Sequence, residues 1–539
     1  MSGEKAPKKQ SFLQGVAVLT AATIIVKLLG FIYKVPLQNI LQERGFGYFN
    51  TAYDVYNVLL MISTTGLPVA VSRMISQAQA LENYAQIRKI YSVSMKVFLT
   101  IGVIGTLVML VFCKPLSVMV TTNENSWAAI AALSPCVLLI CIVSAHRGFF
   151  QGQSNMTPTS VSQVYEAMIR VVFGLGGAYL MLKKTGSLVY AAAGGIFGVT
   201  AGCIVAVVYL RIQFGKSNQI LQQGGGEAKS GRQTMKELLV IAIPITLSAS
   251  MVSIITLIDT SLVQGQLQNA LGYTLKETRH LYGTYSSGMN LYNLPSSMMT
   301  ALTISVIPTV SASLARNDRV HTSRVINSSL RVTGLMAFPM GLGLWALAEP
   351  IMKLCYPRYD SELGGSLLAV LGIASMFVCL MLISNSILQS YGRVHVPVFT
   401  MLIGGVVKII FNYNLTAVPS INIHAAPFGT LVCFVIVSSL NLFFVYRTME
   451  DKPNYFKVFA KPLIASLVMA VCARFSYRFF AAHIALGGAT TTQIVNVGLA
   501  VVLAVIVYVA LVLALRIVTR DDLALLPKGE KLARILHVR

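Results

Sequence analysis

Seven ionisable side chains interrupt long apolar stretches of this sequence, and these groups have the clearest capacity for chemistry. They are Lys27, Lys34, Asp54, Glu166, Arg170, Asp259 and Lys408. A charged side chain at the centre of a bilayer costs about 2.5–3.5 kcal/mol on insertion scales. We therefore expect these groups to face protein or water, where they would bind a charged ligand, couple to an ion or pair with one another.

Polar residues follow helical spacing in the first two apolar stretches. One stripe, with steps of three or four residues, contains Thr20, Thr23, Lys27, Gly30 and Lys34. The next stretch carries Asn50, Asp54 and Asn57 at the same spacing. Because such steps place side chains on one face of a helix, each stretch presents one polar face.

The second half of the chain repeats this pattern. One stretch carries, beside Asp259, the residues Thr246, Ser250, Ser253 and Thr260. The next carries Ser286, Asn290, Asn293 and Ser297. Four such stripes predict a water-accessible central cavity lined by the first, second, seventh and eighth spans. The alternative is that these hydroxyls and amides join helices to one another.

Positive charge is concentrated in the first half of this predicted cavity. Its first half has Lys27 and Lys34 against one acid, whereas its second half has Asp259 and neutral amides. An ammonium group binds phosphate as a point charge, and it raises the potential of a low-dielectric cleft. We therefore assign the anionic part of a substrate to the two lysines, although either lysine, and Lys34 more readily than Lys27, has the alternative of extending to the membrane interface. The other predicted substrate ligands are Asp54, Asn57, Arg170, Asn290 and Asn293.

A second charged motif lies further along the chain. Glu166 and Arg170 are four residues apart, a spacing at which two helical side chains can pair. Lys408 takes the place of Arg170 in the second half, where Gly404 replaces the acid. Glu166, Asp259 and Lys408 are thus candidates for ion coupling or for structural pairing.

The composition indicates that membrane helices hold these residues in place. Of the 539 residues, 55% are hydrophobic and 11% are charged, against roughly 25% charged in a soluble domain. This excludes a soluble enzyme. The net charge of +23 would fit nucleic acid in a soluble protein, but here we attribute it to the retention of Lys and Arg on cytoplasmic loops.

Fourteen apolar stretches are long enough to span about 30 Å of hydrocarbon. They begin near residues 14, 46, 94, 127, 158, 187, 236, 281, 330, 364, 396, 424, 457 and 490. Loops on the side of the N-terminus hold 28 Lys and Arg, and the opposite loops hold 10. This bias predicts a multi-pass membrane protein with both termini in the cytoplasm.

A weak internal repeat divides the chain. Gln151-Gly152, Pro158 and Arg170 recur as Gln389-Ser390, Pro397 and Lys408, at offsets of 238 or 239 residues. We predict an all-α integral membrane protein with two six-helix lobes, related by a pseudo-twofold axis along the membrane normal, plus two C-terminal helices. The predicted boundaries are 1–213 for the first lobe, 214–234 for a cytoplasmic linker, 235–448 for the second lobe, and 449–539 for the last two helices and tail.

Longer motifs resemble a known family. The stretch from Arg147 to Pro158, continuing through Gln163, Glu166 and Arg170, resembles the signature of the bacterial polysaccharide biosynthesis and stage V sporulation protein B family. Further matches are Lys27 to Phe31, Gly66 to Ser72, and Leu388-Gln389 through Pro397 to Lys408. That family belongs to a superfamily with multidrug and toxin extrusion antiporters, oligosaccharide-lipid flippases and lipid II flippases.

The resemblance implies two lobes that rock between inward-open and outward-open states. For lipid II flippases it also implies cavity cations that hold the pyrophosphate of an undecaprenyl-linked sugar. Lys27 stands where those proteins carry an arginine, and Lys34 is one residue beyond their next cation. Before Leu294-Pro295, where those flippases have an Asp-Arg pair and a Glu, this chain has Met289, Asn290 and Asn293.

We therefore expect a flippase that moves an undecaprenyl-pyrophosphate-linked glycan precursor, lipid II, across the bacterial cytoplasmic membrane, with a vegetative or sporulation-specific role left open. Its expected partners are the lipid-linked sugar pyrophosphate, membrane lipids, and the cell-wall synthesis or division machinery, with no nucleic acid. We expect no cofactor, and coupling to membrane potential, H⁺ or Na⁺.

Three alternatives stay open. The first is a flippase for O-antigen-type or other polysaccharide precursors. The second is a cation-coupled multidrug exporter with Asp54 and Asp259 as ion sites. The third is a membrane-embedded glycan polymerase or ligase, for which the outer-loop carboxylates Glu349, Asp360 and Glu362 are poor candidates. The sequence has no HExxH, Walker A or nucleophile-elbow motif, so it offers no enzyme site of those classes.

Overall fold

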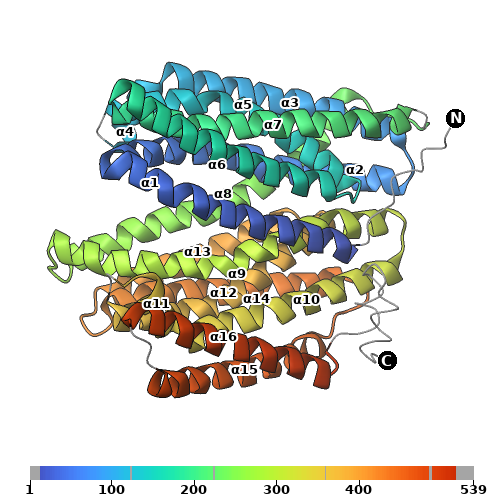
Figure 1. Ribbon diagram of the computed structural model, residues 1–539. Helices are drawn as coiled ribbons and strands as arrows, with labels where there is room; N and C mark the ends of the chain where they lie inside the picture. Colours follow the sequence, from blue (N-terminus) through green and yellow to red (C-terminus); the bar gives the residue numbers. More distant parts are fainter. Residues whose placement is uncertain (1–11, 122–123, 223–224, 358–359, 485–487, 518–539) are drawn as a thin grey trace. The chain divides into compact units, whose positions relative to one another are not determined.

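Every regular element in the described part of the chain is a helix. The computed structural model describes residues 12–121, 124–222, 225–357, 360–484 and 488–517, and these ranges contain no strand (Figure 1). The all-α prediction is therefore confirmed. The helices form two compact units, which are described separately below. Unit 1 comprises Met1–Ala249 and Ile307–Asp318, and unit 2 comprises Ser250–Val306 and Arg319–Arg539.

Unit 1 consists of seven helices, a short 3-10 turn and parts of two further helices. They are α1 (Phe12–Thr64), α2 (Gly66–Ala80), α3 (Tyr84–Val111), α4 (Cys113–Thr121), η1 (Glu124–Ser126), α5 (Trp127–Gly152), α6 (Thr157–Thr185), α7 (Leu188–Gln222), the start of α8 (Gly231–Asn269) and the end of α9 (Leu275–Ala315). Helix α5 packs against α2, α3 and α7, and α1 packs against α5, α6 and α7. The hydrophobic core of unit 1 includes Leu37, Ile75, Phe98, Phe149 and Ile196, which are all buried.

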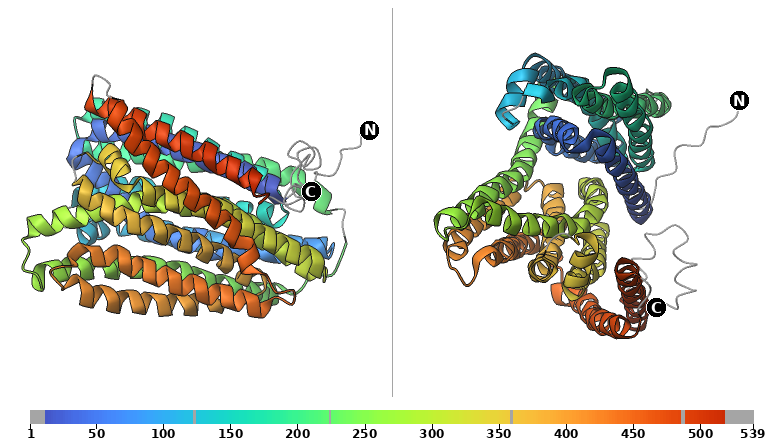
Figure 2. Two further views of the ribbon diagram at one scale, coloured as in Figure 1. Left: turned by 90° about the horizontal axis from the view of Figure 1, so that it is seen from below. Right: turned by 60° about the vertical axis from the view of Figure 1, so that its left-hand side comes forward.

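Unit 2 contains the remainder of α8 and α9 and the helices that follow. They are α10 (Arg319–Ala346), α11 (Ala348–Cys355), α12 (Ser361–Ser390), α13 (His395–Thr416), η2 (Asn422–His424), α14 (Ala425–Thr448), α15 (Tyr455–His483) and α16 (Ala489–Ala514). Helix α12 packs against α10, α11 and α14, and α13 packs against α14. Helices α15 and α16 lie side by side, with α15 against α10 (Figure 2).

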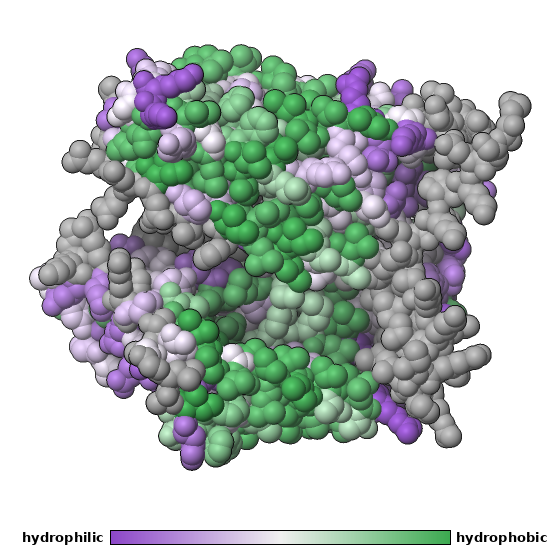
Figure 3. All heavy atoms as spheres, in the orientation of Figure 1, coloured by the Kyte–Doolittle hydropathy of each residue, from purple (hydrophilic) through white to green (hydrophobic). Residues whose placement is uncertain are grey.

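Eleven of the described helices are long and apolar enough to cross a membrane. The count becomes twelve if α10 and α11, which meet at a 77° bend, form one span. The two remaining predicted spans, near residues 46 and 236, fall within α1 and α8, so the total of fourteen stays a prediction. Apolar side chains cover the middle of the helices and polar ones gather toward their ends on the face in Figure 3. The chain is therefore a multi-pass membrane protein.

Helix boundaries recur at the spacing of the sequence repeat. Helix α5 ends at Gly152 and α12 ends at Ser390, and α6 begins at Thr157 where α13 begins at His395. Each pair of positions is 238 residues apart, the offset found between the two halves of the sequence. Both halves thus build the same turn between corresponding helices.

Glycines bring the backbones of α6 and α7 into direct contact. A Cβ atom placed on Gly177 would lie 2.5 Å from the carbonyl oxygen of Gly194, and one on Gly198 would lie 2.3 Å from the backbone nitrogen of Gly174. Small residues permit such close approach between membrane helices. Because α6 also carries Glu166 and Arg170, this glycine seam fixes the helix that presents the charged motif.

Substitution within the seam is expected to destabilise unit 1. Gly198→Ala forces α6 and α7 apart, and overpacking of this kind costs about 1–3 kcal/mol or more. Thermal unfolding of the purified protein in detergent should therefore occur at a clearly lower temperature than in wild type. Gly176→Ala is the matched control, because nothing lies within 4 Å of a Cβ there. Equal stability of the two variants would contradict the described contact.

Candidate functional site

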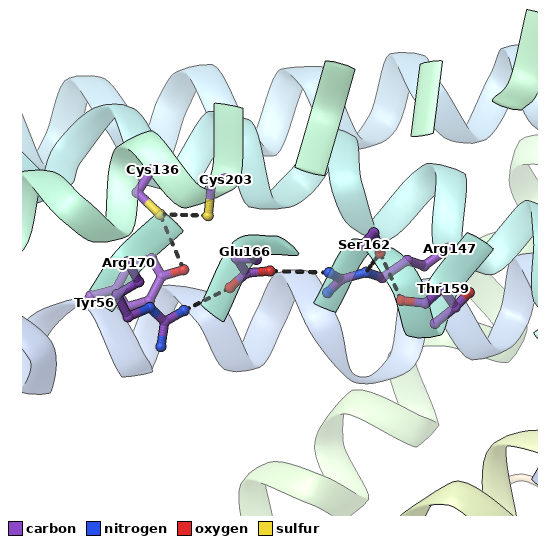
Figure 4. A network of polar contacts seen from close by, with 8 residues as sticks. All are labelled: Tyr56, Cys136, Arg147, Thr159, Ser162, Glu166, Arg170 and Cys203. Atoms are coloured by element: carbon purple, nitrogen blue, oxygen red, sulfur yellow. Dashed lines mark hydrogen bonds and ion pairs between the residues drawn. The ribbon is translucent and has the colours of Figure 1, made fainter. Parts of the chain in front are cut away.

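Three charged side chains form a continuous network in unit 1. Nη2 of Arg147 lies 3.0 Å from Oε2 of Glu166, and Nη2 of Arg170 lies 2.7 Å from Oε1 of the same carboxylate (Figure 4). The predicted pairing of Glu166 with Arg170 is therefore present in the structure. The contact to Arg147 is an addition that the spacing along one helix did not reveal.

The ends of two helices hold this network in place. Arg147 lies in the last turns of α5, and its Nε donates to Oγ of Ser162 at 3.0 Å. Ser162 in turn donates to the carbonyl oxygen of Thr159 at 2.7 Å in the first turns of α6 (Figure 4). The α5–α6 turn thus brings Arg147 alongside the face of α6 that carries Glu166.

The network has more positive than negative charge. Among the described side chains, two guanidinium groups share the single carboxylate of Glu166. Nε of Arg170 is buried and has no hydrogen-bond partner in the described part of the chain. Since buried charges are normally paired and hydrogen-bonded, the surplus charge and the unused donor are features that an anion would satisfy.

Helix α1 borders the same region of α6. The side chain of Tyr33 donates from its hydroxyl to the carbonyl oxygen of Gly195 at 2.9 Å, and its ring would lie 2.7 Å from a Cβ on Gly174. Gly174 is one helical turn beyond Arg170. The segment of α1 that contains Tyr33 and the exposed Lys34 therefore neighbours the turn of α6 that carries Arg170.

A separate buried pair lies in unit 2. Nζ of Lys408 on α13 is 2.9 Å from Oδ2 of Asp259 on α8, and both side chains are only 6% exposed. The side-chain amide of Asn412 donates to the other oxygen of Asp259. Oδ1 of Asn412 and Oγ1 of Thr416 are buried and have no hydrogen-bond partner among the described residues. The charges of this pair balance one to one.

The two units therefore supply the carboxylate partner of equivalent cations from different helices. Lys408 occupies the repeat position of Arg170, and the acid missing from its own helix is supplied by Asp259. At the position equivalent to Glu166, Gly404 instead packs against Val437 and Cys433 of α14. Within the described residues, the candidates for ion coupling or structural pairing thus form a neutral pair in unit 2 and a positively charged network in unit 1.

The other predicted substrate ligands lie apart from these clusters. The exposed side chains are those of Lys27, Lys34, Asn57, Asn290 and Asn293. Asn290 donates from Nδ2 to the hydroxyl of Tyr356 at 3.4 Å. The side chain of Asp54 lies outside the described residues. The central cavity proposed for these residues combines positions from both units and stays a prediction.

Two residues of these clusters were absent from the predicted site. Arg147 stands in the family-like motif before Pro158, and Asn412 stands one helical turn beyond Lys408. The second could have been recognised as the next polar position on the same helical face. In the part of the chain that the structure describes, no group of three or more His, Cys, Asp or Glu side chains could hold a metal ion.

Comparisons with known proteins agree with this architecture. A model described as polysaccharide biosynthesis protein matches residues 12–314, and a MatE model matches residues 244–414. Stage V sporulation protein B of Bacillus subtilis (strain 168) is 24% identical over 521 residues, which cover 96% of this chain and 98% of that protein. The lipid II flippase MurJ of the same organism is 26% identical over 476 residues, which cover 85% of this chain and 86% of that protein.

Solved structures give the same fold at low sequence identity. An outward-facing multidrug resistance MATE family transporter of the MOP superfamily has a TM-score of 0.68 at 12% identity, covering 83% of this chain and 98% of that one. A second structure is a MOP superfamily transporter from Pyrococcus furiosus, described as having a binding pocket of reverse polarity. It has a TM-score of 0.64 at 12% identity, covering 87% of this chain and 99% of that one.

Proposed function

Because this chain belongs to the polysaccharide biosynthesis protein family, we propose that it is a flippase for an undecaprenyl-pyrophosphate-linked cell-wall glycan precursor, with lipid II as the substrate. At the coarser level the chain is a membrane flippase or transporter of the MOP superfamily and not an enzyme. The proposed direction is from the cytoplasmic to the outer leaflet of the bacterial cytoplasmic membrane, with both termini in the cytoplasm.

The surplus positive charge of unit 1 is the observation that carries this proposal. The network of Arg147, Glu166 and Arg170 has one cation more than it has anions among the described side chains, and α1 adds the exposed Lys27 and Lys34. A pyrophosphate diester supplies negative charge and oxygen acceptors that match these groups. A cationic drug would be repelled by the same charges.

Different residues are proposed to bind different parts of the substrate during translocation. Lys27, Lys34 and Arg170 would bind the phosphate oxygens, while the polyprenyl tail stays in the lipid. The other predicted substrate ligands are Asp54, Asn57, Asn290 and Asn293, and we propose that they bind the sugar through hydrogen bonds. Substrate binding would stabilise the closed form, and release outside would let the empty protein reset. The pair of Asp259 and Lys408 is the proposed element for coupling to membrane potential, H⁺ or Na⁺.

A reconstituted assay tests this function directly. Purified protein in liposomes should move fluorescent lipid II between leaflets, as measured by a reagent that reacts only with outer-leaflet label. Protein-free liposomes are the control. In cells, depletion should cause lipid II to accumulate in the inner leaflet. Accumulation of a different lipid-linked sugar would redirect the proposal to another polysaccharide flippase.

A MatE match over residues 244–414 favours cation-coupled drug export as a second candidate. Under that alternative, the carboxylate of Asp259 would exchange cations during export. Loss of the protein would then increase sensitivity to cationic drugs while leaving lipid-linked sugars unchanged. Unchanged drug sensitivity together with a cell-wall defect would exclude it.

A further inference from the structure

We propose that Glu166 competes with the substrate phosphate for Arg170. In the empty protein the carboxylate holds Arg170, and an arriving phosphate takes its place while Arg147 keeps Glu166 neutralised. This inference rests on the proposed function and adds two positioning residues, Arg147 and Glu166, to the ligand Arg170. No covalent bond changes in this exchange.

The two arginines differ in their hydrogen bonds and in their exposure. Arg147 makes two side-chain hydrogen bonds, one to Ser162 and one to Glu166, both at 3.0 Å. Among the described residues, Arg170 makes one, to Glu166 at 2.7 Å, and its Nε has no partner there. The side chain of Arg170 is also more exposed, at 26% against 15% for Arg147. Arg170 is therefore the guanidinium that can turn toward a ligand.

The charge count makes the exchange favourable. When Arg170 leaves Glu166, the pair of Glu166 and Arg147 remains neutral and hydrogen-bonded, so no buried carboxylate is left unpaired. Arg170 then offers its planar fork of donors to phosphate oxygens, which it can bind in a bidentate manner. The network thus supplies a cation for the substrate without leaving a charged group unpaired in either state.

The corresponding pair in unit 2 lacks this property. Lys408 and Asp259 are 6% exposed and balance one another, and the third member, Asn412, is neutral. Withdrawal of Lys408 toward an anion would leave Asp259 buried without a cation, which is strongly unfavourable. The exchange is therefore assigned to unit 1 alone.

Single and double substitutions give a distinctive pattern. Glu166→Gln removes the competing charge, so phosphate should bind more tightly and leave more slowly. Arg147→Gln leaves Arg170 as the one described cation beside Glu166, so phosphate should bind more weakly. With both substitutions Arg170 has no competitor, and binding should return to at least the wild-type level. A purely structural role for Arg147 would not be rescued by removing Glu166.

Binding of undecaprenyl pyrophosphate to the full chain in lipid nanodiscs provides the measurement, with neutral undecaprenol as the comparison ligand. A charge-assisted hydrogen bond contributes roughly a factor of ten to affinity. We therefore expect Kd to fall about tenfold in Glu166→Gln and to rise about tenfold in Arg147→Gln. Lipid II flipping by Glu166→Gln should slow, because release is slower. The control is Glu237→Gln, which removes the acid of an exposed pair with Lys229 in the same unit and should leave Kd unchanged.

The outcomes separate this inference from the proposed function. If the wild-type protein binds undecaprenyl pyrophosphate no better than undecaprenol, the proposed function itself fails. If it prefers the pyrophosphate but Glu166→Gln binds equally or less tightly, the exchange is wrong. Should Glu166→Gln not fold, as judged by thermal unfolding, the double variant decides, and weaker binding than wild type then overturns the inference.

Discussion

Replacement of Lys408 by methionine is expected to destabilise the protein by about 3–5 kcal/mol, the cost of breaking a buried ion pair by removing one partner. The carboxylate of Asp259 lies 2.9 Å from Nζ of Lys408 and is 6% exposed. After the substitution its one remaining described side-chain partner is the amide of Asn412. Thermal unfolding in detergent and the amount of folded protein in the membrane should both fall sharply.

The double variant Lys408→Met with Asp259→Asn should recover much of that stability, because it removes both charges together. If flipping stays absent in this folded double variant, the pair serves ion coupling, and if flipping returns, the pair is structural. Arg319→Gln is a matched control in the same unit, since its contact with Glu450 is highly exposed and such pairs contribute about 0–1 kcal/mol. A stable Lys408→Met protein would contradict the buried pairing.

Replacement of Lys27 by glutamine is expected to abolish lipid II flipping, whereas Lys27→Arg should keep much of it. Lys27 lies ten residues into the candidate span Ala17–Lys34, about 15 Å along the helix axis. Its side chain is exposed, as are those of Ile24 and Leu28. A cation at this depth is costly unless it meets water or an anion, and glutamine is a slightly shorter polar side chain without the charge.

Flipping rates in liposomes, corrected for the amount of reconstituted protein, provide the measurement for the two Lys27 variants. Thr23→Ala is a suitable control on the same stripe, because its hydroxyl donates to the backbone oxygen of Leu19 at 2.8 Å and carries no charge. Full activity of Lys27→Gln would remove Lys27 from the substrate site. Equal loss in Lys27→Arg and Lys27→Gln would show that more than the charge is required.

Features that depend on neighbours along the chain were predictable from the sequence. The pairing of Glu166 with Arg170 follows from a spacing of four residues on one helix, and the structure contains it. The matching turns after Gly152 and Ser390 follow from the repeated motif that precedes a proline in each half. Hydropathy likewise predicted the helical character of the described chain, because an apolar segment must satisfy its backbone hydrogen bonds internally.

Contacts between distant helices were not predictable in the same way. Asp259 and Lys408 are 149 residues apart in the sequence, and their contact depends on the packing of α8 and α13 rather than on any local period. Arg147 reaches Glu166 across the α5–α6 turn, whose direction the spacing alone does not give. An ionisable residue without a partner on its own helix is therefore expected to pair with a residue of opposite charge on another span.

The backbone contact between α6 and α7 also governs how this chain can diverge. At Gly177 and Gly198 a Cβ atom would meet the opposing backbone, so we expect substitutions at these two positions to be poorly tolerated. On the same helix as Gly177, the exposed Val172 and Leu180 can exchange with other apolar residues at little cost. We therefore expect changes in substrate preference to be tolerated at the polar residues of α6 rather than at the glycines that contact α7.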